Sequence, residues 1–307
     1  MRCINISQLN KSIQTDAMGF IKKSNDDYTA KVTAVAKNIA EKVKEKPLVL
    51  LSGPSGSGKT TTAYKISDAL KLLGVESQII SMDNYFIPNK KIDEKNVPRD
   101  EKGEIDLESP YRVDIGLFQE QMKLMCECKT ADIPVFDFVN QDYSSYTPLT
   151  RKEGEVIIIE GIHALNPEVT GEMHEKASCV YVSVRTRLKT SAGDLLHPSY
   201  VRLMRRLIRD KLFRGREYDD IFAMYASVQR GENLYIMPHK HRADYDIDTF
   251  IDYEAPVYKS VIYEDLLEHE DTRFPDMRKM VLEYLKELET IPTVFVPKNA
   301  LIKEFIG

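Results

Sequence analysis

The chain has 307 residues, of which 42% are hydrophobic and 30% are charged, as in ordinary globular proteins. This length allows one large domain or two small ones, and the net charge of −5 argues against a protein that coats nucleic acid. No apolar run approaches the roughly 20 residues of a membrane-spanning helix, and the N-terminus lacks the apolar stretch of a secretion signal. The four cysteines show no zinc-binding spacing and are expected to be free thiols in a reducing cytoplasm. From the charge, the apolar runs and the cysteines together, we expect a cytoplasmic protein with neither nucleic-acid nor membrane partners.

Residues 1–46 precede the first predicted strand of the sheet and contain no recognisable catalytic pattern. From Thr29 to Lys46 apolar residues recur at helical spacing, and Asn25, Asp26 and Asp27 are candidates for the N-cap. We expect an N-terminal helical extension packed on the rest of the chain. A helix that docks a partner, or the tail of another domain, is the alternative.

A glycine-rich turn follows the apolar run LVLL at 48–51 and leads into a helical pattern over Thr61–Leu73. A strand, the pattern G-x-x-x-x-G-K-T and a helix together form a phosphate-binding loop (P-loop) in its expected context. The glycines let backbone N–H groups point at an anion, Lys59 supplies a cation for the outer phosphates, and the Thr60 hydroxyl can bind magnesium. A plain turn between a strand and a helix is the alternative. The predicted nucleoside triphosphate site comprises Gly53, Ser55, Gly56, Ser57, Gly58, Lys59, Thr60 and Thr61.

A second predicted strand, Ser77–Ser81, ends two residues before Asp83. Ligands of open parallel sheets bind beyond the carboxyl ends of the strands, so Asp83 is expected to face the phosphates. A carboxylate there can accept the proton of a hydroxyl nucleophile or help to hold magnesium, whereas a turn or capping aspartate is the alternative. The polar, proline-containing stretch 87–112 predicts a long surface excursion, either a substrate lid or disorder.

The next segments predict a helix over Asp114–Cys126 and a hairpin over Ile133–Thr147. The hairpin segment alternates and is aromatic, which suits a flap over a pocket, although a plain edge hairpin fits as well. Val156–Ile159 is a pure apolar run that ends at Glu160, as in a buried central strand. A carboxylate at the tip of such a strand is suited to hold magnesium, and a simple surface glutamate is the alternative.

A predicted strand at Cys179–Val184 precedes a basic helix over Tyr200–Arg216. Its apolar residues share one face, and four arginines (202, 205, 206 and 209) share the other. A solvated basic face is the usual meaning of such a pattern. Next to a polyphosphate site, the arginines would form a lid that neutralises charge on the transferring phosphoryl group. Further predicted elements are helices at 219–229 and 276–289, strands at 247–252 and 293–296, and a polar tail.

Five segments in this order resemble the uridine kinase / phosphoribulokinase family of P-loop kinases, over about two-thirds of the chain, Leu48 to Asp252. The resemblance implies the P-loop NTPase fold: an α/β, three-layer α/β/α sandwich with a mostly parallel central sheet, a β-hairpin flap and a helical arginine lid. Residues 47–307 would form this kinase domain. The segments are GPSGSGKTT at 53–61, SMDNYF at 81–86, IPVFDF at 133–138, EGIHAL at 160–165 and RRLIRD…RGR at 205–216.

The resemblance also implies ATP and Mg²⁺ as cofactors and a nucleoside 5′-hydroxyl as acceptor. It assigns Asp83 as general base, Glu160 as a magnesium ligand and Asp106 as the ribose-binding aspartate. The catalytic set is Lys59 and Asp83 with the lid arginines Arg206, Arg209, Arg214 and Arg216, and the expected metal ligands are Thr60, Asp83 and Glu160.

The base-binding positions depart from the pyrimidine-specific members of that family. Where those members have a tyrosine, a histidine and a glutamine, this chain has Phe86, Gln141 and Met224. A site that loses hydrogen-bonding partners should relax or shift its choice of base. The expected substrate-binding residues are Asp83, Phe86, Asp106, Phe136, Gln141 and Met224.

We therefore predict an ATP-dependent kinase of a small-molecule hydroxyl, similar to uridine kinase but with an altered or relaxed base preference. A kinase of a sugar phosphate or other small alcohol, or an ATP-binding regulatory module without catalysis, is the alternative. A GTPase is disfavoured because Asn89-Lys90 is followed at the fourth position by Ile92 instead of aspartate. The partner is a small-molecule substrate, and a homo-oligomer is left open.

Overall fold

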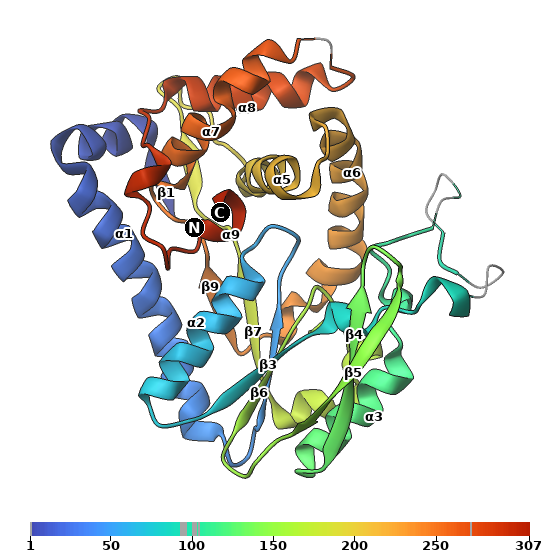
Figure 1. Cartoon of the computed structure of the whole chain (residues 1–307). Coiled ribbons are helices and arrows are strands. Elements are labelled where there is room, and N and C mark those ends of the chain that lie inside the picture. The colour runs from blue at the N-terminus through green and yellow to red at the C-terminus, as the bar shows by residue number, and fades with distance from the viewer. Residues whose placement is uncertain (1, 93–96, 100–102, 104, 271) are drawn as a thin grey trace.

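A five-stranded parallel sheet forms the centre of the molecule (Figure 1). The computed structural model describes residues 2–92, 97–99, 103, 105–270 and 272–307, so part of the predicted excursion over 87–112 lies outside the described residues. The strand order is β3-β6-β2-β7-β9, and every neighbouring pair is parallel. The mostly parallel central sheet is confirmed. Its strands are β2 (Leu48–Ser52), β3 (Ser77–Ser81), β6 (Val156–Glu160), β7 (Ala177–Ser183) and β9 (Tyr245–Asp248).

Side chains of the central strand β2 alternate between two hydrophobic clusters, because successive residues of a strand face opposite sides of the sheet. Val49 and Leu51 join one cluster and Leu48 and Leu50 the other, and all four are fully buried. Burying each of these side chains contributes about 1.5–3 kcal/mol. Helices α1 (Ile6–Lys42) and α2 (Lys59–Leu72) cover the first cluster and α3 (Ile115–Cys126) the second, which confirms the three layers.

The C-terminal half adds helices around the first cluster, in the upper part of Figure 1. Within the described residues, no helix is both long enough and apolar enough to cross a membrane. The predicted hairpin is confirmed as the antiparallel pair β4 (Thr130–Asp137) and β5 (Asp142–Thr150), and β1 (Cys3–Asn5) pairs with β8 (Arg187–Lys189). The remaining helices are α4 (Pro167–Thr170), α5 (Pro198–Arg214), α6 (Tyr218–Gly231), α7 (Glu254–Glu268), α8 (Pro275–Glu287) and α9 (Lys303–Ile306).

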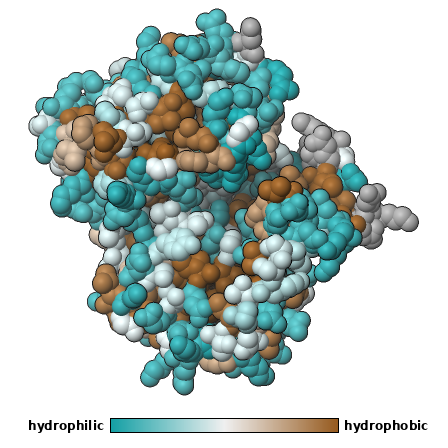
Figure 2. Space-filling view, viewed as in Figure 1, coloured by the Kyte–Doolittle hydropathy of each residue, from teal (hydrophilic) through white to brown (hydrophobic). Residues whose placement is uncertain are grey.

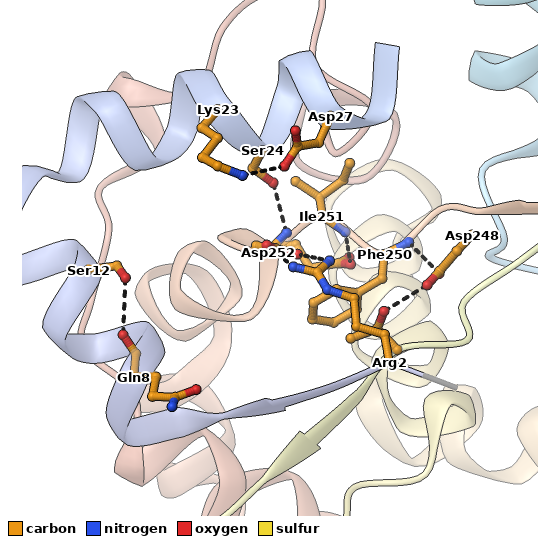
Figure 3. Close-up of polar contacts among 12 residues, drawn as sticks. Arg2, Gln8, Ser12, Lys23, Ser24, Asp27, Asp248, Phe250, Ile251 and Asp252 are labelled. Carbon is orange, nitrogen blue, oxygen red and sulfur yellow. Dashed lines mark hydrogen bonds and ion pairs between the residues drawn. The ribbon is translucent and has the colours of Figure 1, made fainter. Parts of the chain in front are cut away.

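The N-terminal segment is tied to the loop that follows β9 (Figure 3). Helix α1 spans 37 residues, with non-helical backbone at Asp16, and so begins well before the predicted start. The Arg2 guanidinium donates to Asp252, 2.7 Å away, and the Asp252 backbone N–H donates to the Ser24 hydroxyl. Tyr28 is buried in the cluster shared with the main body. These contacts fasten α1 to the loop at the end of the sheet.

Two predictions about the C-terminal segment are wrong. Residues 293–296 were predicted as a strand, but Thr293–Phe295 form a 3₁₀ turn between Pro292 and Pro297. Prolines cannot donate to a strand ladder, and Val294 is 81% exposed, so nothing supports pairing there. The tail predicted as polar is instead packed into the core, because Leu301, Ile302 and Phe305 are fully buried.

The polar face predicted for α5 is also wrong in part, since two of its arginines are structural. Arg205 is fully buried and forms an ion pair with Glu254, with 2.7 Å between Nε and Oε2. Its other nitrogens donate to the carbonyls of Gly56 at 2.9 Å and Thr249 at 2.7 Å. Arg202 donates to Glu232 at 2.6 Å. Arg205 therefore joins the P-loop, the end of the sheet and the start of α7.

Replacing Arg205 by methionine should destabilise the protein strongly, because it leaves the Glu254 carboxylate buried without its partner. We expect the free energy of unfolding to fall by about 3–5 kcal/mol. Urea denaturation of Arg205→Met measures this, with Lys211→Met as the control, because Lys211 pairs with the exposed Glu217 and should cost less than about 1 kcal/mol. Equal losses in the two variants would contradict the structural role of Arg205.

Candidate active site

A cleft of about 300 Å³ lies at the carboxyl ends of β2, β3 and β6. Parallel strands deliver the residues that follow them to the same edge of a sheet, which is where open α/β folds bind ligands. Helices α5 and α6 and the C-terminal residues complete its walls. It is lined by Ser55, Gly56, Gly58, Lys59, Thr60, Asp83, Phe86, Leu107, Glu108, Glu160, Ile162, Arg206, Arg209, Arg214, Arg216, Met224 and Glu304.

The P-loop between β2 and α2 has a backbone that only glycine adopts easily. Gly56 and Gly58 have φ angles of 74° and 82°, in the left-handed region. A Cβ atom on Gly53 would lie 2.1 Å from the Val182 carbonyl oxygen, so the loop packs directly against β7. Helix α2 begins at Lys59, and its first N–H groups lack intrahelical partners. The loop thus has the shape and the partial positive charge that bind anions.

The predicted carboxylates Asp83 and Glu160 both line the cleft. The Asp83 side chain is exposed to the cleft, but many protein atoms surround it. The resulting loss of hydration raises its pKa, and the positive charges of Lys59 and Arg214 oppose this rise. Burial likewise raises the pKa of Glu160, and Lys59 again opposes the shift. The positive charge of Lys59 therefore favours the ionised forms of both carboxylates and limits the rise in their pKa.

Glu108 is a third carboxylate in the cleft, and the sequence did not single it out. Burial raises its pKa to about 7, against the opposing charges of Arg206 and Lys59. Its side chain packs against α6, where a Cβ atom on Gly231 would lie 2.2 Å from the Glu108 Cβ atom. Any side chain at position 231 would therefore displace Glu108. Glu108 lies in a polar stretch of sequence without a motif, so its position in the cleft is evident only from the packing of the folded chain.

The four predicted lid arginines, Arg206, Arg209, Arg214 and Arg216, surround one fully buried carboxylate, Asp210. The Asp210 oxygens lie 2.8 Å from Arg209, 3.3 Å from Arg216 and 3.4 Å from Arg214. Gly215, with a φ of 62°, turns the chain back so that Arg216 reaches Asp210. Burial opposes ionisation of Asp210, but the arginines outweigh it and lower its pKa.

The structure brings most of the predicted site residues into this cleft. Among the described residues, those predicted but not lining it are Gly53, Ser57, Thr61, Asp106, Phe136 and Gln141. The Ser57 hydroxyl is buried in the P-loop without a hydrogen-bond partner among the described residues. The Asp106 carboxylate is held by Arg230 at 2.7 Å and by the Tyr235 hydroxyl at 2.9 Å. The roles assigned to all of these residues stay predictions.

An aromatic cluster connects the hairpin to the mouth of the cleft. Phe86 lines the cleft, and its ring centroid lies 6.0 Å from that of Phe136 and 6.2 Å from that of Phe138. Gln141, at the hairpin turn, donates to the Phe138 carbonyl. Phe138 is 53% exposed, and Figure 2 shows hydrophobic side chains gathered over the hairpin tip. The hairpin thus presents aromatic faces beside the charged cleft.

Comparison with known proteins places these features in a family. The sequence profile of the Phosphoribulokinase / Uridine kinase family matches residues 48–254. The uridine kinases of Staphylococcus aureus strains JH9 and Newman are each 30% identical over 203 residues, which are 66% of this chain and 87% of theirs. A crystal structure from Silicibacter sp. TM1040, named provisionally as a fructose transport system kinase, covers 70% of this chain and 98% of its own, with a TM-score of 0.50 and 19% identity. That likeness shows the fold alone.

Replacing Asp210 by asparagine should destabilise the protein, because the arginines around it lose their counter-charge. We expect the free energy of unfolding to fall by about 3 kcal/mol or more at low salt and by less in about 1 M salt, where repulsion between exposed guanidinium groups is screened. Denaturation at both salt concentrations tests this, with Asp220→Asn on the exposed start of α6 as control. An unchanged stability at low salt would remove Asp210 from this role.

Proposed function

Because the chain belongs to the phosphoribulokinase / uridine kinase family, we propose that it is an ATP- and Mg²⁺-dependent kinase that phosphorylates the 5′-hydroxyl of a nucleoside. One observation carries this proposal. A single cleft holds the P-loop cation Lys59, the carboxylate of Asp83 and four arginines, and the aromatic cluster lies at its mouth. The cation, the carboxylate and the arginines are the kinds of groups that phosphoryl transfer to an alcohol uses, and the aromatic side chains suit a flat acceptor.

The P-loop would bind the phosphates of ATP. Backbone N–H groups of the loop and the Lys59 ammonium group are donors for the β- and γ-phosphates. The Thr60 hydroxyl and the Glu160 carboxylate fit Mg²⁺, which prefers oxygen ligands and keeps several positions for phosphates and water. Within the described residues, no three His, Cys, Asp or Glu side chains form a metal cage. When bound, Mg²⁺ would neutralise charge on the phosphates.

Transfer requires a hydroxyl oxygen that attacks the γ-phosphorus atom while the bond to the bridging oxygen of ADP breaks. Asp83 would accept the proton of that hydroxyl, and ADP would leave with the electrons of the broken bond. The arginines held by Asp210 would stabilise the negative charge that develops on the phosphoryl oxygens. Lys59 lies in the same cleft, and its ammonium group would also stabilise the negative charge on the phosphoryl oxygens.

The aromatic cluster supports a nucleoside as the acceptor. A nucleobase has two flat faces that stack on aromatic side chains, an interaction worth about 1–3 kcal/mol per base. Phe86 and Met224 line the cleft but offer no strong hydrogen-bonding groups to distinguish uracil from other bases. We therefore propose a relaxed base preference. Glu108, which also lines the cleft, would accept a hydrogen bond from a ribose hydroxyl.

Measuring ADP release with ATP, Mg²⁺ and a panel of nucleosides and sugar phosphates tests the proposal. We expect turnover with several nucleosides, purine and pyrimidine alike. Turnover with sugar phosphates alone would replace the nucleoside by another alcohol as acceptor. ATP binding without transfer to any acceptor would indicate a regulatory module in place of a kinase.

Replacing Asp83 by asparagine should abolish most turnover while ATP binding persists. The amide cannot accept the hydroxyl proton, and general-base catalysis typically contributes 10²–10⁴-fold, so we expect kcat to fall by about that factor. Calorimetry should give a Kd for ATP within about threefold of the wild type, because the P-loop is unchanged. Asp132→Asn, on the exposed face of β4, is the control. Normal turnover of Asp83→Asn would show that another group takes the proton.

Replacing Glu108 by glutamine should remove a pH dependence near neutrality. The pKa of Glu108 is about 7, so its carboxylate is protonated below that pH and accepts hydrogen bonds less well. In the wild type, kcat/KM for the nucleoside should rise about tenfold from pH 6 to pH 8, and in Glu108→Gln this limb should be absent, with a raised KM. The same acid limb in both proteins would assign it to a different group.

A further inference from the structure

The C-terminal tail, residues 297–307, lies across the P-loop. Figure 1 shows its helix α9 next to α5 and above the turn between β2 and α2, as the contacts between these elements require. Leu301 packs on the loop so closely that a Cβ atom on Gly58 would lie 3.0 Å from its Cδ1 atom. The Phe305 ring lies beneath the Arg205 guanidinium, 5.0 Å away. The tail is thus seated on the phosphate-binding element itself.

Glu304 places a carboxylate on donors of that element. One of its oxygens accepts hydrogen bonds from the Thr61 backbone N–H, at 3.2 Å, and from the Thr61 hydroxyl, at 2.6 Å. The N–H group belongs to the first turn of α2, where backbone donors lack intrahelical partners and attract anions. Glu304 also lines the cleft, together with Lys59 and Thr60. Glu304 thus holds two donors of Thr61, a residue that the P-loop pattern predicts to bind the nucleotide.

We propose that the C-terminal tail is a built-in competitor of the nucleotide, in which Glu304 occupies the Thr61 donors and is displaced when a nucleotide phosphate binds. This inference rests on the proposed ATP site. Two anions on one pair of donors repel each other, and ATP brings several further negative charges next to Glu304. Glu304 and Phe305 lie on the same short helix, α9, so displacement of that helix from the P-loop would also unseat Phe305. Nucleotide affinity therefore includes the work of unseating the tail.

A purely structural role for Glu304 makes different predictions. A glutamate that only caps α2 would stay in place when nucleotide binds, and its loss would lower stability without changing nucleotide affinity. A competitor also stabilises the nucleotide-free protein, but its loss tightens nucleotide binding. The two roles are therefore distinguished by nucleotide affinity and by the protection of the tail from hydrogen exchange, because both roles predict a loss of folding stability.

The first experiment compares the wild type with Glu304→Gln, which keeps the shape of the side chain and removes its charge. Calorimetry with ADP, and separately with pyrophosphate, should show about tenfold tighter binding to the variant, the factor that corresponds to loss of a charge-assisted hydrogen bond. Glu264→Gln, an exposed glutamate on α7, carries the same change of charge and should bind as the wild type does. Equal or weaker binding by Glu304→Gln would overturn the inference.

The second experiment uses the unmodified protein, so it does not depend on how the variant folds. Hydrogen exchange of residues 300–307 should become at least about tenfold faster when ADP saturates the protein, because the tail leaves its seat. Unchanged or slower exchange would overturn the inference. If ADP binds and the kinase assay succeeds while the tail stays protected, this inference alone fails. If neither protein binds ADP or pyrophosphate, the proposed function fails with it.

Discussion

Four arginines can share one cleft only because a buried carboxylate lies among them. Asp210 contacts Arg206, Arg209, Arg214 and Arg216, and the left-handed turn at Gly215 brings the last of these back to it. Asp210 reduces the repulsion among these four cations, and the guanidinium groups of all four still line the cleft. Two of these arginines act on carboxylates of the cleft, because Arg214 opposes the rise in the pKa of Asp83 and Arg206 opposes the rise in the pKa of Glu108.

The carboxylates of the cleft are the counterpart of these cations. Burial alone would favour the neutral forms of Asp83, Glu160 and Glu108, and the nearby cations oppose that shift. Carboxylates whose pKa is raised by burial and lowered by nearby cations are typical of sites where protons move during a reaction. Glu304 adds a further carboxylate beside the P-loop, where it accepts hydrogen bonds from Thr61. Under the proposed function, binding of a nucleotide would exchange one set of charge pairs for another.

A second set of contacts keeps the P-loop in position. Arg205 donates to the Gly56 carbonyl on the loop and to the Thr249 carbonyl at the end of β9, and it pairs with Glu254 on α7. Arg205 thus holds the loop from the side of α5, whereas the sequence pattern of this helix predicted Arg205 on its polar face. A rigid loop matters for phosphoryl transfer, which depends on position and electrostatics more than on covalent chemistry. The same helix supplies this brace and three of the cleft arginines, Arg206, Arg209 and Arg214, and Arg216 follows its C-cap.

The sequence by itself determined the elements whose signals are local. The apolar runs at 48–51 and 156–159, the glycines of the P-loop and the carboxylates that follow β3 and end β6 are short-range patterns, and the parallel sheet brings them to one edge. Only the tertiary structure decided the partners of Arg205, the position of Glu108 beside Gly231 and the burial of the tail. Glu304 meets Thr61 across 243 residues of sequence. No local pattern encodes such a contact, because burial of the tail depends on a surface that distant segments build together.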